Sequence, residues 1–202
     1  MKLRPVVLAV AACLPYLAAA SAAEAPSKAS GRVTLFDGHS LAGWHPEGDA
    51  QWRIVEGALV SDQSGDGWLR SDKTYSDFIL TLEFRNSPKG NSGVFLRASA
   101  ESKPGEPNPK DAYELQIYNE DPKWPTGTIE DVIARKVDVN PAAGRWHRYE
   151  VEVRGGKIEA SLDGQNVLAG HDDKLKSGHI GLQHHRGMKI EFRRIAVVPL
   201  TP

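Results

Sequence analysis

The chain has 202 residues, long enough to enclose one sizeable hydrophobic core. It carries 25 Lys and Arg against 26 Asp and Glu, a net charge of −1, with no block of basic residues, which argues against a nucleic-acid partner. Its 19 glycines and 13 prolines recur as turn signals at short intervals, a spacing typical of an all-β protein rather than a helical one.

Residues 1–23 have the composition of a secretory signal peptide. Lys2 and Arg4 precede an apolar run, and the small residues 21–23 form a cleavage site. The run is short for a membrane anchor, so we expect no transmembrane segment once the signal is removed. The signal predicts export to the periplasm or the medium, and residues 24–31 should form a disordered leader.

Cys13 allows another interpretation of this signal, because Val10-Ala-Ala-Cys13 is similar to a bacterial lipobox and would leave a lipidated cysteine at the new N-terminus. The apolar run continues past Cys13, which favours ordinary cleavage. Cys13 is the only cysteine, so the cleaved chain can have neither a disulfide nor a Cys-bound metal. Cleavage also removes two basic residues, leaving 23 against 26 acidic ones, a net charge of −3.

The rest of the chain, residues 32–200, is predicted to form one β-sandwich domain. Short strands are expected at 32–36, 52–55, 58–60 and 67–70. A strand pair follows: apolar residues occupy every second position from Phe78 to Phe84, so one face should meet the core, with Glu83 and Arg85 on the other. The turn formers 86–93 lead into a strand beginning at Val94.

Later strands are expected at 113–118, 178–185 and 189–198, and a hairpin spans 145–163 around Gly155-Gly156. No helix is long enough to cross between parallel strands. The predicted fold is therefore an all-β jelly-roll sandwich of two antiparallel sheets.

The polar faces of these strands could together form one surface suited to sugar hydroxyls, with Trp68 and Trp124 at its rim. The residues concerned are Glu83, Arg85, Arg97, Glu114, Gln116, Gln183 and His185. The outer face of any antiparallel sheet is polar, however, so alternation alone does not separate a binding surface from an ordinary solvated one.

Sandwich β-glucanases carry Glu-x-Asp-x-x-Glu on one strand, and retaining hydrolysis needs two carboxyl groups flanking the bond. Here the comparable stretch, Glu114 to Asn119, has amides in place of two of the acids, although Glu83 with Glu114 could supply a pair. The histidines match no zinc motif, so no metal ligand or cofactor is assigned, with a divalent cation kept as an alternative. His185 is a candidate acid or base.

Several motifs resemble the 3-keto-disaccharide hydrolase domain family, long regarded as a domain of unknown function, within the concanavalin A-like lectin and glucanase superfamily. They are Leu35-Phe-Asp-Gly38, Leu41-x-Gly-Trp44, Trp52-Arg-Ile-Val-Glu-Gly-Ala-Leu59, Phe78-x-Leu-x-Leu-Glu-Phe84, Gly90-Asn-Ser-Gly-Val-Phe-Leu-Arg97, Tyr113-Glu-Leu-Gln-Ile117, Gly144-x-Trp146 and Gly178-x-Ile-Gly-Leu-Gln-x-His185. The resemblance covers about residues 33–198 and implies a jelly roll acting on carbohydrate, in some members on 3-keto-glycosides.

A 3-ketone acidifies the neighbouring C2 hydrogen, so this chemistry would need a base, an acid and a donor to the enolate oxygen. We expect Glu83 or Glu114 as the base and His185 as the acid. The sugar would be positioned by Arg97, Asn91, Gln116, Gln183 and Trp124.

The chain departs from the family pattern at the histidine. A common Leu-Gln-Asp-His-Gly reads Leu182-Gln-His-His-Arg-Gly187, so the acid beside His185 is missing and its basicity should differ. Two further interpretations stay open: a carbohydrate-binding module of the same fold without turnover, and a structural protein–protein domain.

Overall fold

The computed structural model describes residues 31–62, 65–100 and 111–201. The predicted signal peptide and residues 24–30 of the predicted leader lie outside this part of the chain. Within it, the backbone forms strands and turns but no helix, and every strand pair is antiparallel. The prediction of an all-β jelly-roll sandwich of two antiparallel sheets is therefore confirmed.

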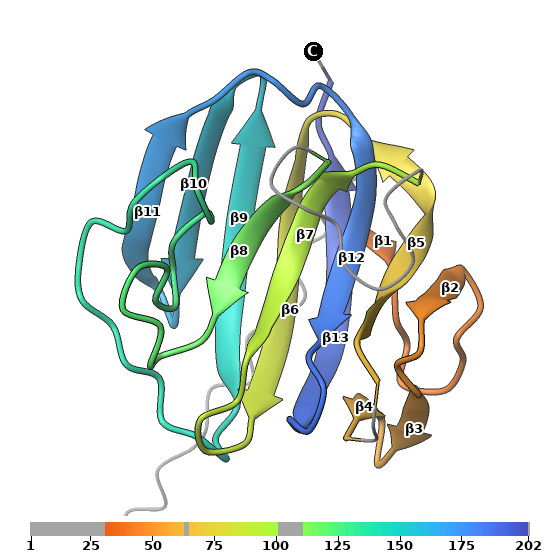
Figure 1. Cartoon of the computed structure of the whole chain (residues 1–202). Coiled ribbons are helices and arrows are strands. Elements are labelled where there is room, and N and C mark those ends of the chain that lie inside the picture. Colours follow the sequence, from red (N-terminus) through yellow and green to blue (C-terminus); the bar gives the residue numbers. More distant parts are fainter. Residues whose placement is uncertain (1–30, 63–64, 101–110, 202) are drawn as a thin grey trace, which may run out of the picture.

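Two sheets make up the sandwich, and Figure 1 shows sheet B in front of sheet A. Sheet A has the order β11-β10-β9-β6-β13-β4-β3, with β1 paired to β13, and sheet B has the order β2-β5-β12-β7-β8. The strands of sheet A are β1 (Val33–Thr34), β3 (Arg53–Val55), β4 (Ala58–Ser61), β6 (Phe78–Asn86), β9 (His147–Arg154), β10 (Lys157–Leu162), β11 (Gln165–His171) and β13 (Ile190–Pro199). Those of sheet B are β2 (Trp44–Gly48), β5 (Gly67–Tyr75), β7 (Ser92–Ala98), β8 (Tyr113–Ile117) and β12 (Gly178–His184).

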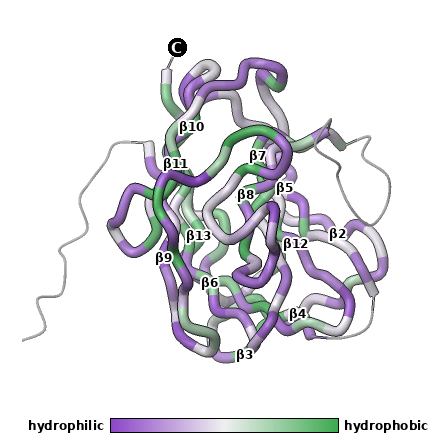
Figure 2. The backbone as a smooth tube through the Cα atoms, turned by 60° about the vertical axis from the view of Figure 1, so that its left-hand side comes forward, coloured by the Kyte–Doolittle hydropathy of each residue, from purple (hydrophilic) through white to green (hydrophobic). Residues whose placement is uncertain are grey.

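The core lies between the sheets and follows from the alternation in the sequence. Phe78, Leu80, Leu82 and Phe84 of β6 are at most 1% exposed and face Val94, Leu96 and Leu115 of sheet B within one cluster. The tube in Figure 2 changes between green and purple repeatedly along its strands, as expected where one face of each strand is buried. The predicted hairpin is also present, because Arg154 of β9 pairs with Lys157 of β10 across Gly155-Gly156.

The connection from β6 to β7 decides where the candidate residues fall. These strands are consecutive in the sequence, but β6 belongs to sheet A and β7 to sheet B, so the intervening loop crosses the sandwich. The outward-facing residues of β6 and β7 therefore lie on opposite sides of the molecule. The expectation that their polar faces form one surface is wrong, because strand alternation determines the face of a strand but not the sheet it joins.

Candidate functional site

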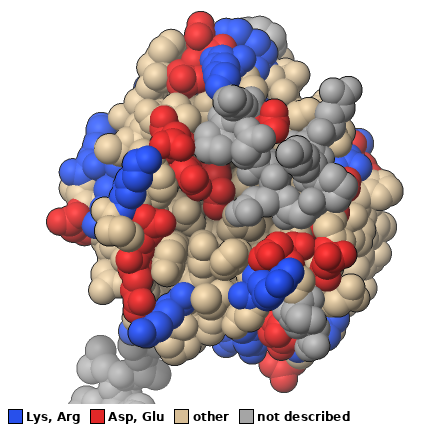
Figure 3. All heavy atoms as spheres, in the orientation of Figure 1, with Lys and Arg blue, Asp and Glu red and all other residues tan. Residues whose placement is uncertain are grey.

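The outer face of sheet B carries three of the eight predicted site residues, namely Glu114, Gln116 and Gln183. Tyr113, Leu115 and Ile117 of β8 enter the core, so Glu114 and Gln116 point outward. Both are largely buried, at 6% and 4% exposure. We call the surface formed by Trp68, Phe95, Glu114, Gln116 and Gln183 the sheet B outer face. Figure 3 views this side of the molecule and shows acidic and basic side chains around a central area of uncharged residues.

A glycine on β7 makes room for the Glu114 carboxylate. Gly93 pairs with Gln116, and Phe95 pairs with Glu114. A Cβ atom at Gly93 would overlap Oε1 of Glu114 and lie only 2.7 Å from its Cγ. The Glu114 side chain therefore lies across β7 toward the middle of the sheet instead of extending into solvent.

A second carboxylate, Glu130, lies directly across from Glu114. The segment after β8 continues the sheet: Glu130 N donates to Glu114 O at 3.1 Å, and Leu115 bridges to Ile129. Ile129 enters the core, so Glu130 faces outward beside Glu114. Residues directly opposite in an antiparallel pair have Cβ atoms about 5 Å apart. The backbone positions of Glu114 and Glu130 are therefore adjacent on this face.

Glu130 was not among the residues predicted from the sequence. It lies in the irregular stretch between the predicted strands at 113–118 and 145–163. A signal was present, since Thr128 and Glu130 flank Ile129 in the alternating pattern of a short strand. Thr128 is 3% exposed, and its backbone oxygen accepts from Gln116 N at 3.0 Å.

Two aromatic rings form the floor of the sheet B outer face. Trp68 and Phe95 meet edge to face at 5.5 Å between ring centroids, and both rings pack on Gly181, where a Cβ atom would overlap Trp68. Trp68 Nε1 is buried and has no hydrogen-bond partner among the described residues. Gln183 pairs with Trp68 across β12 and β5. A buried indole N–H without a partner is costly unless a ligand or water accepts from it.

His185 lies at the edge of the sheet B outer face. Its Nδ1 is 3.0 Å from Oδ1 of Asp66, so the residue just before β5 supplies the carboxylate that the motif around His185 lacks. The backbone N–H of Arg186 donates to that carboxylate at 2.8 Å and, with the positive charges nearby, lowers the pKa of Asp66 against the effect of burial.

Glu114 and His185 lie two strands apart and at different heights on sheet B. Gly181, Phe95 and Glu114 are in register, and His185 is four residues beyond Gly181. At about 3.3 Å per residue and about 4.8 Å per strand, the Cα atoms of Glu114 and His185 are roughly 16 Å apart. His185 and Glu114 can thus contact different parts of an extended ligand.

Glu83 is separated from the other candidates altogether. It lies on the outer face of sheet A, where Arg193 Nε donates to it at 2.6 Å and Arg194 at 2.9 Å. Both arginines reach it because β13 shifts register after Arg193, so two residues of the bulged strand oppose one of β6. The hypothesis that Glu83 and Glu114 form a carboxylate pair is therefore wrong.

Arg97 is a structural residue, not a sugar ligand. It is 1% exposed, with a positive φ of 54° that turns its side chain away from the sheet B outer face. Its five N–H donors all have acceptors: Ser76 O twice, Gly155 O, Leu175 O and Asp77 Oδ1. The prediction that Arg97 positions the sugar is corrected, because no donor is left for a ligand.

The last two candidates, Asn91 and Trp124, lie in loops. Asn91, just before β7, is partly buried, and its Oδ1 has no hydrogen-bond partner among the described residues. Trp124 follows an Asp121 turn, in which Asp121 accepts from its backbone N–H at 2.7 Å. The Lys123 ammonium lies 4.2 Å from the Trp124 ring centroid, so part of that ring is already covered.

No group of three or more His, Cys, Asp and Glu side chains in the described part of the chain could hold a metal ion. What this part offers is two neighbouring carboxyl groups, the amides of Gln116 and Gln183, and the indole N–H of Trp68. Such a set can exchange protons with a polyhydroxylated ligand and fix its orientation.

The fold is a two-sheet β-sandwich, and this face offers groups that suit sugar hydroxyls. The protein belongs to the family described as the 3-keto-alpha-glucoside-1,2-lyase-like domain, whose pattern matches residues 31–198. The resemblance inferred from the sequence motifs is thereby confirmed.

Known proteins are similar to this chain in sequence or in fold. A 3-keto-disaccharide hydrolase from Bacteroides thetaiotaomicron is 27% identical over 175 residues, covering 72% of this chain and 60% of the relative, so the chain spans about three-fifths of that protein. A candidate glycosyl hydrolase from Parabacteroides distasonis shares the fold with a TM-score of 0.74, at 19% identity, covering 86% of this chain and 96% of that one. The carbohydrate-binding module CBM66 from Bacillus subtilis superposes with a TM-score of 0.60, at 17% identity, covering 76% and 93%.

The described residues contain no helix with the length and hydrophobicity needed to cross a membrane.

Proposed function

We propose that this protein is an exported hydrolase that cleaves 3-keto-glycosides, including 3-keto-disaccharides, on the sheet B outer face. The observation that carries the proposal is the juxtaposition of Glu114 and Glu130 on neighbouring strand segments. Membership of the 3-keto-alpha-glucoside-1,2-lyase-like family and the similarity to a named 3-keto-disaccharide hydrolase support the substrate class.

The chemistry would proceed by elimination and hydration. A base removes the C2 proton, which the 3-ketone has made acidic, and an enolate forms. The enolate electrons then make the C1–C2 double bond as the C1–O bond breaks, and the aglycone oxygen takes a proton from an acid. Water adds across the double bond, with its hydroxyl on C1 and its hydrogen on C2. One water is consumed for each bond cleaved.

In this scheme Glu114 is the base and Glu130 the proton donor to the leaving oxygen. Glu114 is the more buried of the two and is held across Gly93, which suits a group that must meet one carbon atom. Trp68 Nε1 and the amide of Gln183 would donate to sugar oxygens. His185, roughly 16 Å from Glu114 between Cα atoms, would contact the far end of a disaccharide rather than the bond that breaks.

The test is product release from 3-keto-trehalose, 3-keto-sucrose and a 3-keto aryl glucoside by the purified domain, with the unoxidised parents as controls and with or without EDTA. Glu114→Gln should lower kcat/KM by at least about a hundredfold, the usual contribution of a general base. Glu83→Gln is the matched control, because it makes the same change on the opposite sheet. Equal activity of the two variants, or equal cleavage of the unoxidised sugars, would contradict the proposal.

The alternative function is sugar binding without turnover, favoured by the shared fold with a carbohydrate-binding module. It predicts no product from any keto sugar and a sugar-dependent rise in melting temperature that Glu114→Gln weakens.

The proposed export rests on the composition of residues 1–23. Cell fractionation of the full-length chain should place it in the periplasm or medium, with an N-terminus after residue 23. A lipidated Cys13 at the N-terminus would instead establish membrane anchoring.

A further inference from the structure

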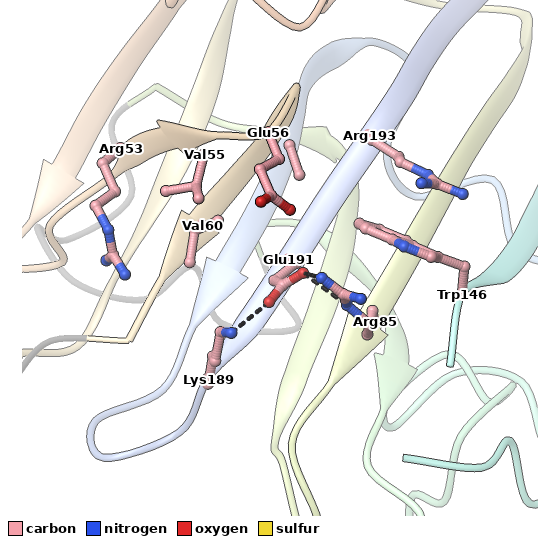
Figure 4. Close-up of a pocket in the computed structure, with 10 residues that line it drawn as sticks. Arg53, Val55, Glu56, Val60, Arg85, Trp146, Lys189, Glu191 and Arg193 are labelled. Atoms are coloured by element: carbon pink, nitrogen blue, oxygen red, sulfur yellow. Dashed lines mark hydrogen bonds and ion pairs between the residues drawn. The ribbon is translucent and has the colours of Figure 1, made fainter. Parts of the chain in front are cut away.

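The outer face of sheet A contains a pocket unrelated to the sheet B outer face. Its volume is about 260 Å³, and Figure 4 shows the side chains around it. The floor consists of Ala58 and Val60 of β4, which are small and nearly buried. Strands β13 and β6 flank this floor on one side, and β3 flanks it on the other. Their long charged side chains form the walls of the pocket. The lining is Arg53, Val55, Glu56, Ala58, Val60, Arg85, Trp146, Lys189, Glu191 and Arg193.

One wall of the pocket is a fixed set of cationic groups. The Trp146 ring lies between Arg85 and Arg193, whose guanidinium carbons are 4.7 and 4.0 Å from its centroid (Figure 4). Arg85 and Lys189 both donate to Glu191, whose side chain is only 5% exposed. These contacts restrain two long side chains before any ligand arrives, which lowers the entropic cost of binding.

Several N–H donors on this wall are not used in hydrogen bonds to other described residues. Arg193 uses Nε for Glu83, and Arg85 uses Nε and Nη2 for Glu191. The remaining guanidinium nitrogens, Nη1 of Arg85 and both Nη atoms of Arg193, have no partner among the described residues, and Lys189 has donors beyond the one it gives Glu191. The lining holds four cations against two carboxylates, in a chain whose net charge is negative.

The opposite wall of the pocket carries a carboxylate and an apolar side chain instead of cations. Glu56, at the tip of the β3–β4 turn, makes no hydrogen bond or ion pair within the described residues, and its carboxylate points toward the pocket in Figure 4. Val55 beside it is 41% exposed. A ligand in this pocket therefore meets anion-binding donors on one side, a carboxylate acceptor on the other and an apolar floor.

We propose that this pocket binds a carboxylate-bearing sugar, such as a hexuronate unit of an acidic polysaccharide. The sugar carboxylate would pair with Lys189 and Nη1 of Arg85, which meet at Glu191, and Arg193 would donate to a sugar hydroxyl. Other hydroxyls would donate to Glu56, and the apolar face of the sugar would cover Val55. The volume is below the 300–1,000 Å³ of sites for drug-sized ligands, which suits a single monosaccharide unit. Guanidinium groups are suited to carboxylates because they offer paired donors in a plane.

The test measures binding of glucuronate and galacturonate to the full chain by calorimetry and by chemical-shift changes, with methyl glucoside as the neutral comparison. The variant is Lys189→Gln combined with Arg193→Gln. It removes two charges, yet Glu191 keeps Arg85 and Glu83 keeps Arg194, so no carboxylate loses its last partner. Arg148→Gln is the matched control, since Arg148 bonds Glu150 on the same sheet face but does not line the pocket.

We expect the hexuronates to bind in preference to methyl glucoside, more weakly at high salt, with a loss of about tenfold or more in the double variant and none in Arg148→Gln. Equal binding by the double variant, equal binding of methyl glucoside, or no hexuronate binding by the unmodified protein would overturn the proposal. Cleavage of 3-keto-glycosides is measured in parallel and should be unchanged in the double variant, so the two proposals fail separately.

Discussion

The carboxylate of Glu114 lies over the Cα atom of Gly93, in the space that any side chain at position 93 would fill. Gly93 has no positive φ, so its backbone does not require glycine; the neighbouring carboxylate does. The position of Glu114 on the sheet B outer face therefore depends on a residue that takes no part in chemistry.

Gly93→Ala should move the Glu114 side chain off β7. We expect a stability cost of about 1–3 kcal/mol from overpacking, together with a fall in kcat/KM on 3-keto-glycosides approaching that of Glu114→Gln. Urea unfolding and initial rates measure the two effects. The control is Gly144→Ala, where the added methyl meets no atom within 4 Å and only the positive φ of 76° is strained. Full activity in Gly93→Ala would show that the orientation of Glu114 is unimportant.

Glu130→Gln and His185→Ala distinguish the two groups that could donate a proton to the leaving oxygen. Because Glu130 is across from Glu114 and His185 is at the rim, we expect the first change to lower kcat by about a hundredfold and the second mainly to raise KM. Steady-state kinetics on 3-keto-trehalose separates these effects. A larger loss of kcat in His185→Ala would assign the acid to the Asp66–His185 pair instead.

Arg97→Gln should be among the most destabilising single changes in the chain. The substitution leaves four main-chain and side-chain acceptors short of donors at a buried site, which we expect to cost about 3–5 kcal/mol. Thermal unfolding should show a fall in Tm of roughly 10 °C or more. Arg154→Gln, a surface arginine paired with Glu152, is the comparison and should cost less than about 1 kcal/mol. A mild effect at Arg97 would mean that the carbonyls around it find other donors.

Glu191 should make the protein sensitive to acid. Burial alone would raise the pKa of Glu191, but the hydrogen bonds from Lys189 and Arg85 outweigh it and hold the pKa below its ordinary value of 4.5. A lowered pKa in the folded state means that the stabilisation is present above about pH 4.5 and is lost as the pH falls through the folded-state value. In urea unfolding between about pH 3 and 7, the free energy of unfolding should fall less steeply with decreasing pH in Glu191→Gln than in the unmodified protein. Parallel curves would disprove the linkage.

The sequence patterns predict the fold well because the strands are strongly alternating. The core faces of β6, β8 and β9, the Gly155-Gly156 turn and the two-sheet architecture all follow from local period and turn chemistry. The sheet to which each strand belongs does not follow, because it depends on pairing between distant segments. Alternation alone therefore groups Glu83 with Glu114, although β6 pairs with β9 and β13 while β8 pairs with β7.

The candidate site could be predicted only in part for the same reason. Glu114, Gln116 and Gln183 share a sheet face, as the alternation suggests. The alternation of β7 places Arg97 on the same face as Phe95. Its left-handed backbone conformation, however, turns its side chain to the other side, and an arginine in the sequence does not indicate such a conformation. Glu130 required recognising one more short strand in a stretch rich in turn residues.

The crossing of the chain between β6 and β7 has a consequence for valency. Packed sheets lie about 10 Å apart with their outer faces directed away from each other. A saccharide on the sheet A pocket and another on the sheet B outer face would share no contact residue and could not compete for space. If both faces bind sugar, the protein is bivalent and can hold two glycan chains at once. A protein with both sites on one face would instead bind two segments of a single chain.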